Sequence, residues 1–341
     1  MKNGNGETFR NLAERRLACL LCARPAVVVA CDADFVRHLD AIAAFVRPQP
    51  GSCVLVSLYW ECETPESVAR LAGAVAAFRA SAPEARLVVL CNTAGECAAL
   101  ERAGMETRWI HQNAFLEERR FRPMGGAERP FDAAYTARLT PFKRHGLLPV
   151  SLAPRLLFLG ASVRKSEVAY GEEMRAKYAA ARWVPSFSGA RISELLAQAK
   201  CGLALSSAEG ACYASAEYLL SGLPVVDTPA LGGRDVLYPW EFVRRVEPTP
   251  EAVAEGIAYW AERRPDPWKV RAAFLAKAEP HRERFRQLML ELTGRACGRP
   301  PHKLGLRTPH PGWAHTRAIQ AYLAWKGFWA ARKSASMGGG K

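Results

Sequence analysis

Short runs rich in β-branched residues alternate with segments of helical pattern along this chain, and this alternation limits its possible folds more than any other feature. Strand-like runs lie at 26–31, 52–58 and 86–91, with a weaker one at 107–110, and a helical pattern covers 65–80. Apolar strands separated by helices of this length pair in a parallel sheet that helices cover on both faces. The first 120 residues therefore predict an α/β domain.

The same alternation predicts a second α/β domain after residue 130. Residues 117–130 (EERRFRPMGGAERP) are charged, contain glycine and end in proline, which is typical of a linker. Further strand-like runs lie at 131–138, 155–160, 181–187, 201–206, 224–228 and 242–247, and one long helical stretch covers 249–293. We predict an N-terminal domain over 1–121, a C-terminal domain over 122–296 and a basic tail over 297–341. In such open sheets ligands bind at the carboxyl ends of the strands, or in a cleft between two domains.

Composition narrows the class of protein and the kind of partner. Hydrophobic residues make up 49% of the chain and charged residues 23%, as in ordinary globular proteins, which excludes wholesale disorder. The net charge of +14 favours an anionic partner, such as a phosphorylated metabolite, a nucleic acid or an anionic membrane surface. No run approaches the ~18 apolar residues that cross a bilayer, so membrane contact would be peripheral.

The cysteines and the start of the chain indicate a reducing compartment. The N-terminus lacks the pattern of a secretory signal, and the ten cysteines are scattered, so we expect reduced thiols and a cytoplasmic protein. Cys19 and Cys22 form a single C-x-x-C without a second pair or a nearby histidine. A zinc or redox site there is the less favoured interpretation.

Segment 206–226 (SSAEGACYASAEYLLSGLPVV) carries one strong signal of a binding site. Glu217 is the only charged residue from 211 to 226, in a helical pattern that is apolar almost all round. Such a helix is buried, and a lone buried carboxylate needs a partner. Two interpretations stay open for Glu217: an ion pair with a basic residue such as Arg244, or hydrogen bonds accepted from the two hydroxyls of a ribose.

The start of the same helix is a candidate binding site for oxygen atoms. Gly210 permits a sharp turn after the strand, and Glu209 at this junction would face the ligand. The backbone amides of Gly210, Ala211, Cys212 and Tyr213 would open the helix, and a helix N-terminus can hold phosphate or sugar oxygens.

Segment 131–148 (FDAAYTARLTPFKRHGLL) supplies cations at the end of another strand. Arg138 ends the strand-like run, and Lys143, Arg144 and His145 follow in the loop. Fixed cations would neutralise the charge that develops on a leaving pyrophosphate. The alternative is a solvated basic surface loop. Segment 231–235 (LGGRD) would lie at the same sheet edge, where its glycines would let the backbone approach a ligand or merely form a turn.

Together these three segments resemble the retaining nucleotide-sugar glycosyltransferases of family 4, which have the GT-B fold of two Rossmann-like domains facing a cleft. ARLTPFKRH is similar to the family's G-R-L-x-x-x-K-G loop, with Ala137 in place of its glycine and Arg144 after the lysine. EGACYASAE has the spacing of its E-x7-E motif, and SGLPVVDTPALGG is similar to the segment that follows. The resemblance covers roughly residues 111–265, whereas the N-terminal half is short and lacks the usual glycine-rich loop after its first strand.

The resemblance implies roles for individual residues. Arg138 and Lys143 would hold the donor diphosphate, Glu209 would contact the donor sugar near its reacting carbon, and Glu217 would bind the ribose. The family also implies a front-face transfer, in which the departing phosphate helps to deprotonate the acceptor. No metal or other cofactor is expected, because GT-B enzymes use basic residues and helix dipoles instead.

Two further features have competing interpretations. Asp32 and Asp34 form a D-x-D, which binds a metal in a different glycosyltransferase fold but is more simply a helix N-cap. The tail contains three tryptophans and eight Lys or Arg with no acid. We expect its helix, around 313–333, to cross back onto the N-terminal domain, although its cations also allow attachment to anionic lipid.

The sequence thus predicts a cytoplasmic retaining glycosyltransferase, compatible with a peripheral position at the inner membrane face. It would move a sugar from a nucleoside diphosphate sugar to a glycan or lipid-linked acceptor, in the synthesis of cell-envelope polysaccharide or glycolipid. The alternative is a catalytically impaired nucleotide-sugar-binding or scaffolding protein of the same fold. A nucleic-acid binder is disfavoured, because only the charge suggests it and no recognised motif accompanies that charge.

Overall fold

A computed structural model describes residues 18–126, 128–160, 165–184 and 191–295. Spatial contacts divide this part of the chain into two units, 18–115 with 282–295 and 116–281. We predicted the first boundary at residue 121 rather than 115. The tail from 297 to 341 and its return to the N-terminal domain lie outside the described residues.

The first unit contains a five-stranded sheet in the order β1-β2-β3-β4-β5. Strands β2 to β5 are parallel, as expected for strands linked by helices, whereas β1 pairs with β2 in an antiparallel hairpin that the sequence pattern does not predict. Arg24 and Pro25 form the turn of this hairpin. The elements are β1 (Ala18–Ala23), β2 (Ala26–Cys31), α2 (Asp32–Arg37), α3 (Leu39–Val46), β3 (Cys53–Ser57), α4 (Pro65–Ser81), β4 (Arg86–Cys91), α5 (Ala94–Arg102) and β5 (Thr107–Trp109).

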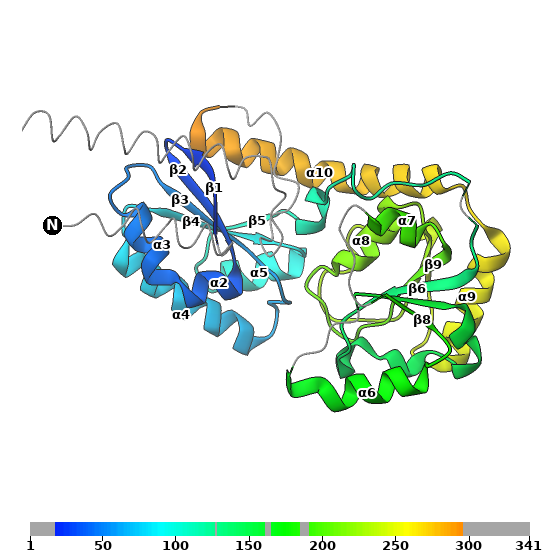
Figure 1. The fold of residues 1–341 in the computed structure, drawn as a ribbon. Helices are drawn as coiled ribbons and strands as arrows, with labels where there is room; N and C mark the ends of the chain where they lie inside the picture. The colour runs from blue at the N-terminus through cyan, green and yellow to red at the C-terminus, as the bar shows by residue number, and fades with distance from the viewer. Residues whose placement is uncertain (1–17, 127, 161–164, 185–190, 296–341) are drawn as a thin grey trace, which may run out of the picture. The chain divides into compact units, whose positions relative to one another are not determined.

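Burial of the strands and capping of the helices stabilise the elements of the first unit. Every residue of β2 and β3 is buried, and Figure 1 shows α3 and α4 along this sheet. Thr64 caps α4, and Thr93 with Glu96 forms a capping box at the start of α5. These side chains satisfy amide groups that a helix start leaves without a partner.

The second unit contains a six-stranded parallel sheet in the order β11-β10-β9-β6-β7-β8. Its core includes Tyr135, Phe158, Leu203 and Val226. The elements are β6 (Phe131–Thr136), β7 (Leu156–Leu159), α6 (Val168–Lys177), β8 (Arg182–Val184), α7 (Ile192–Leu196), β9 (Ala199–Ala204), α8 (Tyr213–Leu220), β10 (Val225–Asp227), β11 (Val243–Arg245), α9 (Pro250–Arg263) and α10 (Pro267–Thr293).

The helical stretch predicted over 249–293 consists of two helices, α9 and α10, with a break between them. Arg264 ends α9 in the left-handed conformation with a φ of 43°, and Pro267 begins α10. Proline favours the first turn of a helix, and the residue before it is disfavoured in helical conformation, so the chain breaks here. Residues 267–281 of α10 belong to the second unit and 282–293 to the first.

The position of α8 depends on one glycine. The ring of Tyr218 lies so close to Gly202 of β9 that a Cβ atom at this position would overlap it. The Tyr218 hydroxyl accepts a hydrogen bond of 2.5 Å from the backbone amide of Thr136, at the end of β6. Since a close-packed core does not tolerate such overlap, Gly202 sets how near α8 approaches the sheet.

The described cysteines are all free thiols, and Cys19 and Cys22 lie on β1. Among the residues described, no three metal-ligating side chains group together. Within the same residues, no helix combines the length and apolar character needed to cross a membrane.

Candidate functional site

Three loops meet at the carboxyl edge of the second sheet, following β6, β9 and β10. The amide of Ser207 donates to the carbonyl of Phe142 at 2.9 Å, which joins the first loop to the second. Ala208 and Leu231 form a parallel bridge, and the Glu209 amide donates to the Leu231 carbonyl at 2.9 Å. The three segments singled out in the sequence are thus connected by backbone hydrogen bonds, as expected for strands whose carboxyl ends share one edge.

Lys143 and Glu209 form an ion pair at the centre of these loops. The Lys143 ammonium contacts Oε1 of Glu209, and the Ser206 hydroxyl donates to the same oxygen at 2.6 Å. The side chains of Lys143 and Glu209 are only 12% and 11% exposed. The structure therefore places together two residues that the sequence predicted from separate motifs, and their burial makes each depend on the charge of the other.

The other basic residues of the first loop do not act as the sequence suggested. Arg144 has a left-handed backbone with a φ of 54°, and its guanidinium donates to four neutral oxygens among the described residues. They are the carbonyl oxygens of Leu205, Ser206 and Pro229 and the hydroxyl of Thr228. Arg144 is thus a structural cross-link between loops.

His145 is fully buried and uncharged. Burial, with a smaller contribution from the charge of Lys143, lowers the pKa of His145 to about 3. Its ring packs on Tyr135, with the ring centroids 4.9 Å apart, and its Nδ1 lies 3.2 Å from the Tyr170 hydroxyl. The predicted contribution of His145 to the positive charge of this loop is therefore wrong.

A pH effect on stability follows from His145. The folded protein keeps this imidazole neutral down to a pKa of about 3, whereas an unfolded chain protonates it near 6.5. As pH falls below 6.5, protons bind preferentially to the unfolded state, so the free energy of unfolding decreases by up to about 1.4 kcal/mol per pH unit. We expect the wild type to lose about 2 kcal/mol more than His145→Phe between pH 7.5 and 5.0.

Urea unfolding of both proteins at the two pH values measures this difference. Burial raises the pKa of Glu96 to about 7, so the folded state binds this proton more tightly than the unfolded state does. The contribution of Glu96 to the free energy of unfolding therefore decreases as pH rises toward 7, which is opposite to the effect of His145. Glu96 is present in both proteins, so its effect cancels in the comparison. An equal loss of stability in the two proteins would show that His145 does not titrate in this way.

Arg138 and Glu217 differ from the ion pair in their environment. Arg138 lies just after β6, half-buried, and its guanidinium has no hydrogen-bond or ion-pair partner among the described residues. Glu217 lies on α8 and is also half-buried, whereas its neighbours Ala216 and Tyr218 are buried. The burial predicted for Glu217 is thus only partial. Arg244, its alternative partner, lies over the ring of Tyr259 at 4.2 Å.

The turn before α8 differs from the prediction in one residue. Cys212, not Gly210, has the left-handed conformation, with a φ of 49°. Cys212 is the N-cap residue of α8, but its side chain makes no capping hydrogen bond. A non-glycine residue in this conformation costs roughly 1–3 kcal/mol unless its surroundings hold it, and such positions concentrate at functional sites. Gly210, Ala211 and Cys212 are buried, and the Gly233 amide donates to the Gly210 carbonyl at 2.8 Å.

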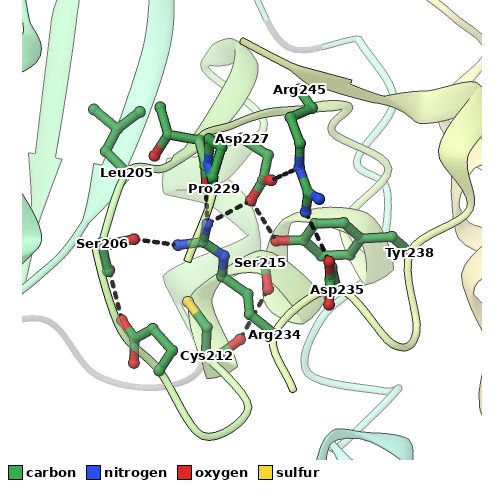
Figure 2. A network of polar contacts seen from close by, with 12 residues as sticks. Leu205, Ser206, Cys212, Ser215, Asp227, Pro229, Arg234, Asp235, Tyr238 and Arg245 are labelled. Carbon is green, nitrogen blue, oxygen red and sulfur yellow. Dashed lines mark hydrogen bonds and ion pairs between the residues drawn. The ribbon is translucent and has the colours of Figure 1, made fainter. Parts of the chain in front are cut away.

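A buried network beneath the loops was not predicted (Figure 2). The Arg234 guanidinium, only 1% exposed, contacts Asp227 at 2.8 Å and donates to the carbonyls of Ser206 and Thr228. Arg245 bridges Asp227 and Asp235, at 2.9 and 2.8 Å, and the Tyr238 hydroxyl donates to Asp227 at 3.2 Å.

The sequence contained a signal for this network. Asp227 ends an otherwise apolar strand, so its carboxylate needs a cation, and the segment LGGRD, which contains Arg234, follows it.

The D-x-D of the first unit is part of a helix. Asp32 and Asp34 lie in the first turn of α2, whose N-cap is Cys31, so the N-cap interpretation is wrong. Oδ1 of Asp32 accepts a hydrogen bond of 3.1 Å from the Tyr59 amide, and Oδ2 of Asp34 accepts one of 3.0 Å from the Cys31 thiol. Acidic residues are stabilising at this end of a helix, which accounts for both side chains.

Comparison with known proteins gives relatives by structure only. No protein-family model matches the chain, and no curated protein sequence matches it. Among solved structures, the Anabaena protein HepE in complex with UDP is 17% identical over 76% of this chain and 77% of its own, with a TM-score of 0.58. The chain has the GT-B fold.

Two other structures agree with this assignment. The UDP-forming trehalose-phosphate synthase of Burkholderia xenovorans, in complex with glucose-6-phosphate, has a TM-score of 0.55 and 11% identity, over 84% of this chain and 77% of its own. The sucrose-phosphate synthase of Thermosynechococcus elongatus has a TM-score of 0.53 and 17% identity, over 76% and 78%. The predicted α/β fold with two Rossmann-like domains is confirmed.

Proposed function

We propose that this GT-B protein is a retaining glycosyltransferase that uses a nucleoside diphosphate sugar. The observation that carries the proposal is the buried ion pair between Lys143 and Glu209, which joins the basic loop to the first residue of the E-x7-E segment. Structures similar to this chain include proteins solved with UDP, such as HepE and the pneumococcal O-GlcNAc transferase GtfA. The sequence motifs, their spatial association and the fold support one activity together.

In the proposed reaction the cationic side chains receive the donor diphosphate. Arg138 has no partner among the described residues, so its charge is available to a phosphate, and Lys143 would exchange Glu209 for a phosphate oxygen. Cations fixed in this way stabilise the charge of the leaving diphosphate without a metal ion. Glu209, released from Lys143, would accept a hydrogen bond from a hydroxyl of the donor sugar. The backbone amides of residues 210–213 would donate to phosphate or sugar oxygens of the donor.

The transfer would then take place on one face of the sugar. The bond between the anomeric carbon and the diphosphate oxygen breaks, and the acceptor oxygen bonds to that carbon from the same side. The acceptor proton passes to the departing phosphate, so no further base is required. The acceptor would be a glycan or a lipid-linked sugar of cell-envelope synthesis, reached from the cytoplasm or from the inner face of the membrane.

Glu217 provides the first test of this proposal. An ionised carboxylate accepts stronger hydrogen bonds from ribose hydroxyls than a neutral amide, by roughly 1–2 kcal/mol. We expect Glu217→Gln to weaken binding of the preferred nucleotide about tenfold while the protein stays folded. Isothermal titration with UDP, GDP and ADP measures the dissociation constants.

The matched control is Glu255→Gln, because Glu255 is an exposed carboxylate on α9 of the same unit. It should leave nucleotide affinity unchanged. Equal affinity of Glu217→Gln and wild type would contradict the ribose role. Nucleotide binding without turnover of any nucleotide sugar would favour the alternative, a binding or scaffolding protein of this fold.

A further inference from the structure

Arg144 is the residue that connects Lys143 to the rest of the site. It follows Lys143 directly, and its left-handed backbone turns the chain so that its side chain reaches the ends of β9 and β10. Its Nη2 atom donates to the Ser206 carbonyl at 3.0 Å and to the Thr228 hydroxyl at 2.8 Å. A guanidinium spread over two neighbouring strand ends holds them at one separation, because its donors form a rigid planar fork.

Arg234 reaches the same carbonyl from another loop. Its Nη1 donates to the Ser206 carbonyl at 3.0 Å, and Asp227 holds the opposite side of its guanidinium at 2.8 Å (Figure 2). A carbonyl oxygen accepts two hydrogen bonds, and donors with a charge make bonds about twice as strong as neutral ones. Ser206 is therefore fixed by two arginines from different loops.

Ser206 in turn contacts the ion pair. Its hydroxyl donates to the Glu209 oxygen that also contacts Lys143. The backbone of Ser206 is thus bound to Arg144 and Arg234, and its side chain is bound to Glu209. A shift of Ser206 would change the position of Glu209, and a shift of Arg144 would change that of its neighbour Lys143.

We propose that Arg144 and Arg234 are positioning residues, which set the placement of Lys143 relative to Glu209 through the Ser206 carbonyl. The inference rests on the proposed function for its catalytic meaning, but the geometry itself is testable without turnover. Catalytic groups must be held within roughly 0.5 Å of their working positions, and an error of about 1 Å can cost 100-fold in rate. Neither arginine needs to touch the substrate for this effect.

Arg144→Gly tests the proposal without straining the backbone, because glycine adopts a φ of 54° freely. We expect kcat for nucleotide-sugar turnover to fall at least tenfold, with KM for the donor within about threefold of wild type. Arg144→Lys, which retains the charge but not the planar fork, should recover part of the rate. A loss of stability alone would not produce this division between kcat and KM.

The control is Arg271→Met. Arg271 donates to the carbonyls of Glu118, Phe121 and Leu220, none of which lies in the three loops of the site. This variant should melt at a lower temperature and keep its kcat. If Arg271→Met lost kcat as strongly as Arg144→Gly, the effect of Arg144 would be one of general stability, and the proposal would fail.

A chemical readout separates this inference from the proposed activity. Reductive methylation followed by peptide mass spectrometry measures how fast Lys143 is modified, with the exposed Lys269 as an internal reference. Pairing with Glu209 should protect Lys143 in the wild type, and Arg144→Gly should raise its modification rate about fivefold or more relative to Lys269. If that ratio stayed unchanged, the positioning role would be excluded, even in a protein that turns over. An increased ratio in a protein without turnover would support positioning and contradict only the glycosyltransferase proposal.

Discussion

Lys143→Met is expected to lower kcat for nucleotide-sugar turnover about 100- to 1000-fold, because in the proposed reaction Lys143 is a fixed cation at the leaving diphosphate. The loss should exceed any change in KM, since the charge on the diphosphate develops mainly in the transition state. Release of nucleoside diphosphate from a panel of nucleotide sugars measures the rate. The variant also leaves Glu209, whose side chain is 11% exposed, without its cation, so stability must be measured in parallel.

A double variant separates the two effects. Lys143→Met with Glu209→Gln removes both charges, so it should recover stability lost by the single variant but not the rate. Lys177→Met is the matched control, because Lys177 is an exposed lysine of the same unit, and it should behave as the wild type. A single variant that keeps most of its turnover would contradict the role on the diphosphate and leave Lys143 as a structural partner of Glu209 only.

The positions of secondary-structure elements were predictable where the residues of a single short segment determine them. The runs at 26–31 and 86–91 coincide with β2 and β4, because continuous β-branched apolar runs have few alternatives to a buried parallel strand. The meeting of three loops followed from topology alone, since parallel strands end at a common edge. The turn of the β1–β2 hairpin and the break at Arg264 each involve only a few residues, and hydrophobic periodicity does not report such short features.

The sequence singled out the loops and residues of the candidate site, but not the contacts between them. The types and spacing of Lys143 and Glu209 suggested an anion site, but their ion pair depends on how far each loop reaches. Arg144 shows the limit clearly, because its sequence context indicates a cation and leaves open whether that cation faces a ligand or backbone carbonyls. Likewise, the sequence does not indicate that the left-handed residue is Cys212 rather than Gly210, because tertiary packing determines this.

Asp227→Asn should produce the largest loss of stability among these variants. Asp227 is fully buried, and it is the carboxylate that balances the buried Arg234 while also contacting Arg245. Removing one partner of a buried ion pair leaves an uncompensated charge, which costs about 3–5 kcal/mol. For a unit of this size the melting temperature should fall on the order of 10 °C. Differential scanning calorimetry measures the change.

Asp235→Asn is the matched control, because it breaks the other ion pair of Arg245, where the two side chains are 38% and 35% exposed. Solvent screens such a pair, so its loss should cost under about 1 kcal/mol. Similar melting temperatures for the two variants would mean that solvent reaches Asp227 and that Arg234 does not depend on it. A large difference would instead identify Asp227 as the anchor of Arg234, whose guanidinium also donates to the Ser206 carbonyl.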